Sequence, residues 1–277
     1  MEAWIVLSHV DAVAAPPSSR VTDAFGDTFD YALCPSSPTT RAYVRDLVAN
    51  VTAAADVDTV VLEAVGPLGA DHNFTHEKTS GADWTTVERQ LLSICFCEHC
   101  RRAYDEAGSG LEAAGLAARV RALLAPGTGA AHDPNPSRLL GDAASGVLRV
   151  RQASTRAARE SVEQAAAANG VTRVRYHASA DDWATGPFTA LAALGDQPDA
   201  ILPSAEILGT DIEAVRTRTG RLSAYTSAMP PRAIDGIGAL IDETAATGVD
   251  EVMIYHAGLL GPSRWERVAQ AIRRVVG

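Results

Sequence analysis

The sequence predicts an α/β fold made of successive βα units, and three observations predict it. Short apolar runs rich in β-branched residues alternate with longer helical patterns along the chain. Six such runs occur, which suits a doubly wound sheet or a (β/α)8 barrel of the TIM type that is incomplete by two strands. No run is followed by a G-x-G-x-x-G turn, which argues against a dinucleotide-binding sheet. With 277 residues, 47% of them hydrophobic, the chain is expected to form a single domain over residues 1–277.

The predicted elements follow one another in a regular order. The strand-like runs cover residues 4–9, 58–63, 172–177, 200–204, 222–226 and 251–256. Helical patterns cover residues 39–55, a stretch from about 84 to the cysteines, 111–124, 137–168, 188–194, 211–219, 233–247 and 264–275. Thr39 is the predicted cap of the first helix, and Asn169 and Gly170 end the long one. Long loops are expected at residues 10–38 and 66–81, and loops of this length are often functional.

Composition argues against several kinds of partner. The formal net charge is −10 and the pI is about 5.1, whereas a surface that binds nucleic acid is basic. No stretch approaches the ~20 apolar residues that cross a bilayer, and the N-terminus lacks the pattern of a signal peptide. We therefore expect a soluble, cytoplasmic protein with no nucleic-acid and no membrane partner, in which thiols stay reduced.

The cysteines form a pattern typical of metal ligands. The protein has four cysteines, Cys34, Cys95, Cys97 and Cys100, and three of them fall within six residues. Neighbouring thiolates of a C-x-C-x2-C segment converge on one ion, and a fourth sulfur from another loop completes a tetrahedral shell. We predict a structural Zn²⁺ bound by these four residues, in a metal-binding insertion around residue 34 and residues 95–100. An iron–sulfur cluster is the main alternative, and His99 is an alternative ligand.

Three segments resemble a known family. The chain reads Cys34-Pro35-Ser36-Ser37-Pro38-Thr39-Thr40-Arg41, then Val60-Val61-Leu62-Glu63, then Cys95-Phe96-Cys97-Glu98-His99-Cys100 with Tyr104. This order resembles the zinc-containing β-galactosidases of glycoside hydrolase family 42, over residues 34–104. The resemblance implies a (β/α)8 barrel, a structural zinc beside the active-site rim, and a general acid/base glutamate that ends the fourth strand, at Glu63.

The same resemblance leaves the barrel incomplete. The strand at residues 4–9 takes the place of the family's third strand, and the first two have no counterpart. The chain is then shortened, or divergent, or completes its barrel from another subunit, so that a homo-oligomer is one expected state. Leu62 stands where the family has asparagine, and residues 224–227 hold no carboxylate where the family has its nucleophile. Two carboxyl groups are the usual requirement for glycoside hydrolysis.

These features lead to three hypotheses about function. The first is a glycoside hydrolase-like enzyme that acts on a carbohydrate or another small-molecule glycoside, with Glu63 as general acid/base. The second is a non-catalytic carbohydrate-binding or scaffold protein that kept the barrel and the zinc but lost the nucleophile. The third is a small-molecule biosynthetic enzyme that uses the histidines and Lys78, the only lysine of the sequence.

Candidate site residues are polar or aromatic groups at strand ends and in the loops that follow them, because barrel active sites lie at the carboxyl ends of the strands. The catalytic candidates are Glu63, Glu206 as a second carboxylate, and His177. The substrate-binding candidates are His9, Asp11, His72, His76, Lys78, Trp183, Tyr225 and His256. Each has a structural alternative: a salt bridge from Glu63 to an arginine, a hydrogen-bonded histidine at a strand end, and packing for Trp183.

Overall fold

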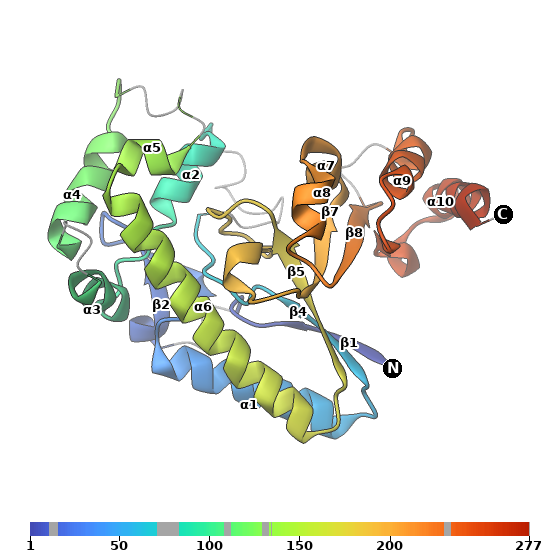
Figure 1. Cartoon of the computed structure of the whole chain (residues 1–277), viewed down its shortest axis with the longest axis horizontal. Coiled ribbons are helices and arrows are strands. Elements are labelled where there is room, and N and C mark those ends of the chain that lie inside the picture. The colour runs from blue at the N-terminus through green and yellow to red at the C-terminus, as the bar shows by residue number, and fades with distance from the viewer. Residues whose placement is uncertain are drawn as a thin grey trace. The chain divides into compact units, whose positions relative to one another are not determined.

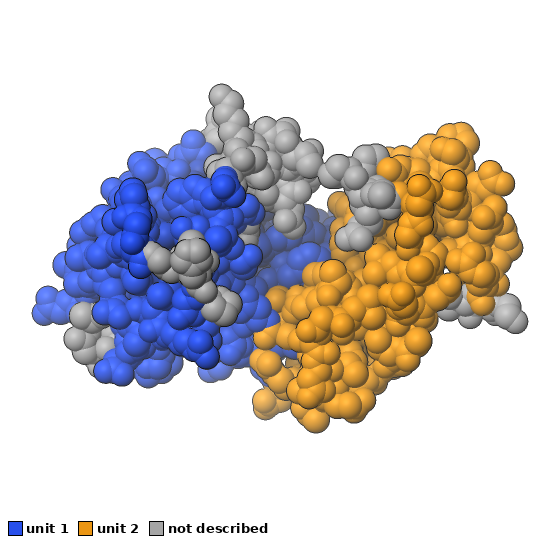
Figure 2. Space-filling model, turned by 90° about the horizontal axis from the view of Figure 1, so that it is seen from above, with its two compact units in different colours: residues 1–177, 181–195 blue, residues 178–180, 196–277 orange. Residues whose placement is uncertain are grey.

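A computed structural model describes residues 1–10, 16–70, 83–107, 112–128, 133, 135–229 and 234–276. The chain forms two compact units, shown in different colours in Figure 2. The first unit comprises residues 1–177 and 181–195, and the second comprises residues 178–180 and 196–277. The expectation of a single domain stays a prediction, and each unit is described by itself.

The first unit is built on three parallel strands. In sheet order they are β1 (Glu2–Val6), β4 (Thr59–Glu63) and β5 (Arg173–Ser179). Successive side chains of a strand point to opposite faces, and on one face the Tyr176 hydroxyl donates to Glu163 of helix α6 (Ala143–Ala168). Helix α1 (Pro38–Ala54) packs beside α6 (Figure 1). The helices therefore cover one face of the strands and leave the other face for a site.

The remaining helices of the first unit surround the cysteines. They are α2 (Thr86–Leu92), α3 (Glu98–Glu106), α4 (Ala113–Leu123) and α5 (Pro136–Leu140). Helix α2 begins with a capping box, in which Thr85 and Glu88 each accept the other's backbone amide. Helix α3 packs against both α4 and α6. The largest hydrophobic cluster of this unit lies among these helices and contains all four cysteines.

The loop predicted at residues 10–38 contains structure that the sequence analysis missed. A 3-10 turn, η1 (Pro17–Ser19), precedes the antiparallel pair β2 (Arg20–Thr22) and β3 (Thr28–Leu33). The side chain of Asp23 accepts the amides of Phe25 and Asp27, and Gly26 adopts φ +97°. These contacts close the turn between the two strands. Strand β2 has three residues, whereas β3 alternates Phe29 and Tyr31 with polar residues and carried a signal that was missed.

Two helix predictions need correction, and helices α3 and α7 (Ser204–Gly209) have no predicted counterpart. The helix predicted at 137–168 is two helices, α5 and α6, because Gly141 adopts φ +59° between them. Residues 188–194 form a short strand, β6 (Thr189–Ala190), and a 3-10 turn, η4 (Leu191–Ala193), instead of an α-helix. Helix α7 follows the fourth predicted strand.

The second unit continues the same βα succession. Its strands β7 (Asp199–Pro203), β8 (Arg221–Ser227) and β9 (Glu251–Tyr255) pair in parallel. The helices after α7 are α8 (Ile212–Arg216), α9 (Ile237–Ala246) and α10 (Pro262–Val276), with the 3-10 turn η5 (Ala257–Leu259). Helices α9 and α10 enclose a core that contains Ile241 and Val268.

All six predicted strands are therefore present, with boundaries shifted by up to three residues, and the α/β class is confirmed. In the described ranges, six strands follow one another with helices between them, and this number fits an incomplete (β/α)8 barrel. None of the helices in those ranges combines the length and the apolar character that a bilayer span requires.

We predict that Gly69→Ala destabilises the first unit. A Cβ atom at Gly69 would lie 2.1 Å from Cβ of Ser93, whose hydroxyl donates to the Arg89 carbonyl and accepts the Ala70 amide. Relief of this clash requires movement of the backbone just before the cysteine segment, at an expected cost of about 1–3 kcal/mol. Urea unfolding measures the change. Gly186→Ala is the control, because nothing lies within 4 Å of its added Cβ; equal stabilities of the two variants would contradict the prediction.

Candidate metal centre and candidate acid–base site

The four cysteine sulfurs come together in the first unit. All four side chains are buried and free of disulfide bonds, and their sulfurs lie within 4.8 Å of one another. The sulfurs of Cys34 and Cys100 are 3.5 Å apart. Tetrahedral coordination with Zn–S bonds of ~2.3 Å sets sulfurs ~3.8 Å apart, so the donor set fits one such ion. Among the described residues, this cluster comprises the four cysteines and does not include His99.

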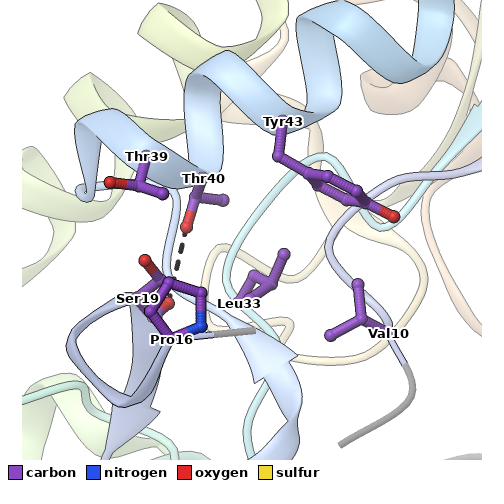
Figure 3. A pocket seen from close by; sticks show the side chains of 7 residues that line it. All are labelled: Val10, Pro16, Ser19, Leu33, Thr39, Thr40 and Tyr43. Atoms are coloured by element: carbon purple, nitrogen blue, oxygen red, sulfur yellow. Dashed lines mark hydrogen bonds between the residues drawn. The ribbon is translucent and has the colours of Figure 1, made fainter. Parts of the chain in front are cut away.

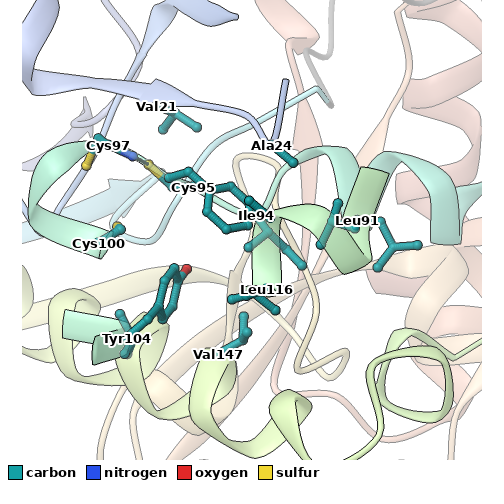
Figure 4. Close-up of a cluster of buried hydrophobic side chains, with 14 of the residues drawn as sticks. Val21, Ala24, Leu91, Ile94, Cys95, Cys97, Cys100, Tyr104, Leu116 and Val147 are labelled. Carbon is teal, nitrogen blue, oxygen red and sulfur yellow. Dashed lines mark hydrogen bonds between the residues drawn. The ribbon is translucent and has the colours of Figure 1, made fainter. Parts of the chain in front are cut away.

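Local structure explains why the sulfurs converge. Cys34 follows β3, and Cys97 is the N-cap residue of α3, so that Cys100 lies in the first turn of that helix (Figure 4). The Phe96 amide donates to the Thr22 carbonyl at 2.6 Å, which joins the cysteine segment to the hairpin β2–β3. Arg41 donates to the carbonyls of Pro35 and Ser36 and holds the loop beside Cys34.

The thiols of the cluster shift one another's pKa values. Hydrogen bonds from Cys100 and Cys34 lower the pKa of the Cys97 thiol, whereas burial raises the pKa of Cys95. The Cys97 amide also donates to the Cys95 sulfur at 3.4 Å. A cation removes the remaining thiol protons when it binds. An iron–sulfur cluster places iron and sulfide between its thiolates and separates them further, so the compact spacing favours a single ion.

A second group of side chains lies on the sheet face opposite α6. Val6 of β1 pairs with Glu63 of β4. Strand β5, on the other side of β4, brings His177 beside Glu63. Trp4 lies two residues before Val6 and therefore on the same face. Its indole Nε1 donates to Glu63 Oε2 at 2.8 Å, and His177 Nδ1 lies 3.8 Å from the same oxygen. The register of three strands thus assembles Trp4, Glu63 and His177.

The environment moves the pKa values of this pair apart. Burial raises the pKa of Glu63, and the hydrogen bond from Trp4 only partly offsets this. Burial, together with the positive charge of Arg175, lowers the pKa of His177 to about 3. The imidazole is therefore neutral at neutral pH, and its contact with Glu63 is not an ion pair. No arginine of the described chain pairs with Glu63, so the salt-bridge alternative is not met.

Aromatic rings and a strained backbone complete this site. The rings of His177 and Phe188 are stacked, with centroids 4.8 Å apart, and the Trp4 ring contacts the imidazole edge-on at 4.5 Å. Ala64, directly after Glu63, adopts φ +57°, which is costly for a residue with a Cβ. Its amide donates to the Pro187 carbonyl at 2.9 Å, so the loop with Phe188 fixes the backbone next to the carboxylate.

The other predicted site residues have separate surroundings. Glu206, in α7, accepts hydrogen bonds from the Ser179 hydroxyl and the Ala180 amide within the second unit. Trp183 is buried, and its indole donates to Ser137 Oγ at 2.9 Å. His9 lies three residues after β1 and forms an isolated bridge with Ala32.

Two further candidates lie near the end of β9. The rings of Tyr225 and Tyr255 are 5.1 Å apart, and His256 is exposed just after the strand. Asp11, His72, His76 and Lys78 lie outside the described residues.

Sequence analysis missed Trp4 and Phe188 as members of the acid–base site. The sequence did contain a signal for Trp4. Val6 pairs with Glu63, and strand alternation places Trp4, two residues earlier, on the same face of the sheet. Phe188 had no such signal, because it was assigned to a helix that does not form.

A shallow pocket in the first unit involves none of the predicted site residues. It has a volume of about 140 Å³ and is lined by Val10, Pro16, Ser19, Leu33, Thr39, Thr40 and Tyr43 (Figure 3). Its lining is mostly apolar, with no titratable group other than Tyr43. It therefore offers no chemistry comparable to that of the Glu63 site.

Comparisons with known proteins assign no family. No protein-family model and no curated protein matches the sequence. Among solved structures, the chain is similar to the catalytic domain of beta-amylase from Paenibacillus polymyxa, with 12% identity and a TM-score of 0.41, over 99% of this chain and 73% of that one. It is also similar to alpha-L-fucosidase isoenzyme 2 from Paenibacillus thiaminolyticus, with 16% identity and a TM-score of 0.48. That match covers 98% of this chain and 36% of the fucosidase. The family 42 resemblance stays a prediction from the residues.

We predict that the purified chain holds one metal ion in its thiolate cluster. Cys34→Ser should lose the ion, because it removes the ligand that the distant loop supplies. A ligand present at about 1,000 times its Kd contributes ~4 kcal/mol to folding, so chelation should also lower the Tm of the wild-type protein. Elemental analysis and thermal unfolding measure both effects. Ser145→Ala, at an exposed position of α6, is the control, and full metal content in Cys34→Ser would contradict the prediction.

We predict a pH-dependent gain of stability in Glu63→Gln. The pKa of Glu63 is raised in the folded state, so the wild-type fold loses stability as the pH rises through that value. Glutamine does not ionise and still accepts from Trp4, so the Tm difference between variant and wild type should be larger at pH 7 than at pH 4. Folded His177 stays neutral in this window. The exposed Glu106→Gln should show no such trend; a trend of the opposite sign for Glu63→Gln would refute the assignment.

Proposed function

We propose that the chain is a glycoside hydrolase-like enzyme that acts on a carbohydrate or another small-molecule glycoside, with Glu63 as general acid/base. The observation that carries the proposal is the raised pKa of a carboxyl group at the carboxyl end of a parallel strand, with no cationic partner among the described residues. Such a carboxyl group keeps its proton nearer to neutral pH and can deliver it to a leaving-group oxygen.

The surroundings of Glu63 suit a sugar. Trp4 and Val6 lie on the same sheet face, and their side chains are 37% and 38% exposed, so an apolar surface adjoins the carboxyl group. Binding sites for small molecules combine such apolar walls with a few placed polar groups. Within this proposal, neutral His177 orients Glu63 or a substrate hydroxyl, and His9, Tyr225 and His256 stay candidate substrate contacts.

The metal of the thiolate cluster is proposed to be structural Zn²⁺, bound by Cys34, Cys95, Cys97 and Cys100. Four thiolates in a closed, buried tetrahedron leave no open position for a substrate, as in structural zinc sites. When bound, the ion offsets half of the thiolate charge and fixes the hairpin β2–β3 to the start of α3. It takes no part in the proposed proton transfer.

Two-carboxylate hydrolysis needs a partner for Glu63, and Glu206 is the proposed second carboxylate. Its hydrogen bonds to Ser179 and Ala180 hold the carboxylate in a defined orientation within the second unit. A homo-oligomer and a cytoplasmic location are further proposals that come from the sequence.

We predict that Glu63→Gln lowers kcat/KM for aryl glycosides by about 10²–10⁴-fold, the usual contribution of a general acid/base. The loss should be smallest for the most acidic aryl leaving groups, which need little protonation. Asp58→Asn is the matched control: Asp58 precedes the same strand at its opposite end and is exposed.

Wild-type rates in Glu63→Gln would reject the assignment. Sugar binding by calorimetry without turnover across a panel of glycosides would instead establish the non-catalytic alternative.

A further inference from the structure

Helix α6 carries a buried arginine that the proposed hydrolysis does not use. Arg151 is 8% exposed, and its Nη2 donates to the carbonyls of Ala184 at 2.5 Å and Trp183 at 3.4 Å. The guanidinium carbon lies 5.5 Å from the centroid of the Trp183 ring. In the part of the chain that the structure describes, Nη1 has no hydrogen-bond partner. A buried cation held only by carbonyls and a ring is costly unless a negative charge lies nearby.

Two sources of negative charge act on Arg151, the carboxylates of Asp181 and Asp182 and the thiolate cluster that contains Cys100. Cys100 and Tyr104 lie one turn apart on α3, and Val147 and Arg151 lie one turn apart on α6. Helices α3 and α6 pack together, and the four cysteines, Tyr104, Val147 and Trp183 share one buried cluster (Figure 4). Burial lowers the pKa of Arg151, and the groups that act against this include Tyr104, Asp181 and Cys100.

Charge counting shows what the cluster requires. Four thiolates and one divalent cation leave a net charge of about −2 in a buried site. The Cys97 amide and the N-terminus of α3 offset part of it through dipoles. Arg41, beside the Cys34 loop, is only half-buried, so water screens its charge. Arg151, by contrast, is buried, so water does not screen its positive charge.

We propose that Arg151 is the buried counter-cation of the thiolate metal centre, and that its hydrogen bonds to Trp183 and Ala184 tie the loop after β5 to that centre. The proposal rests on the metal site of the proposed function and not on the hydrolase activity. Metal binding and the order of residues 181–184 are then coupled, because the same guanidinium serves both.

The test is zinc affinity, measured by competition with a chromophoric chelator on the full chain. Arg151→Met keeps the length of the side chain and removes the charge, and it should weaken Zn²⁺ binding by about 10–100-fold, the usual effect of losing an outer-shell partner. Arg151→Lys keeps a positive charge but lacks the planar guanidinium group. Its loss of Zn²⁺ affinity, expressed as log Kd, should be at most half of the loss in Arg151→Met. Arg156→Met, exposed on the same helix, should leave the affinity unchanged.

Hydrogen exchange provides a second readout. Zinc removal from the wild-type protein should speed amide exchange at residues 181–184, and in Arg151→Met these amides should exchange quickly with or without zinc.

If Arg151→Met fails to fold, Arg151→Gln takes its place. Equal zinc affinities of the neutral variant and the wild type, equal losses in the neutral and lysine variants, or absence of zinc binding by the wild type would overturn the proposal. A chain without hydrolase activity that shows the charge-dependent affinity supports this proposal and rejects the proposed function.

Discussion

The convergence of four sulfur atoms is the constraint on which the first unit depends. Cys34 follows a strand of the hairpin β2–β3, whereas the other three cysteines lie more than 60 residues later along the sequence. Apolar packing alone would not hold such polar, ionisable groups within 4.8 Å of one another in a core, because burial of thiolates without a cation is costly. In the proposed metal centre, an ion turns this cost into a cross-link between the hairpin β2–β3 and the start of α3.

The sheet imposes a second kind of order, which comes from strand register. Parallel pairing of β1, β4 and β5 places Glu63 between Val6 and His177 on the face opposite α6. Helix α6 covers the other face, where Tyr176 meets Glu163. In a closed barrel, inward side chains pack against one another in layers. Here the same face presents a carboxyl group, an imidazole and a half-exposed indole, which is the composition of a site and not of a filled core.

The sequence was sufficient for the features that depend on strong local patterns. Apolar runs located all six parallel strands, and cysteine spacing identified the four residues that converge. It failed where a single backbone conformation decides the outcome. Gly141 breaks a continuous helical pattern, and the Asp23 turn pairs the three-residue strand β2 with β3. Packing is one of the roles expected for Trp183, but its partners Arg151 and Ser137 could not be predicted, since they reach it from distant segments.

The opposite pKa shifts of Glu63 and His177 decide which of the two keeps its proton to the higher pH. Both groups are largely buried, and burial disfavours whichever form carries charge. For the carboxyl group this is the deprotonated form, so its pKa rises; for the imidazole it is the protonated form, and Arg175 adds to the fall. A proton shared by the pair therefore resides on Glu63 and not on His177. The imidazole then serves as a neutral hydrogen-bonding group, and the strained Ala64 keeps the acid in place beside it. This division of roles suits an acid that donates to a leaving group, and it disfavours Glu63 as a permanently ionised nucleophile.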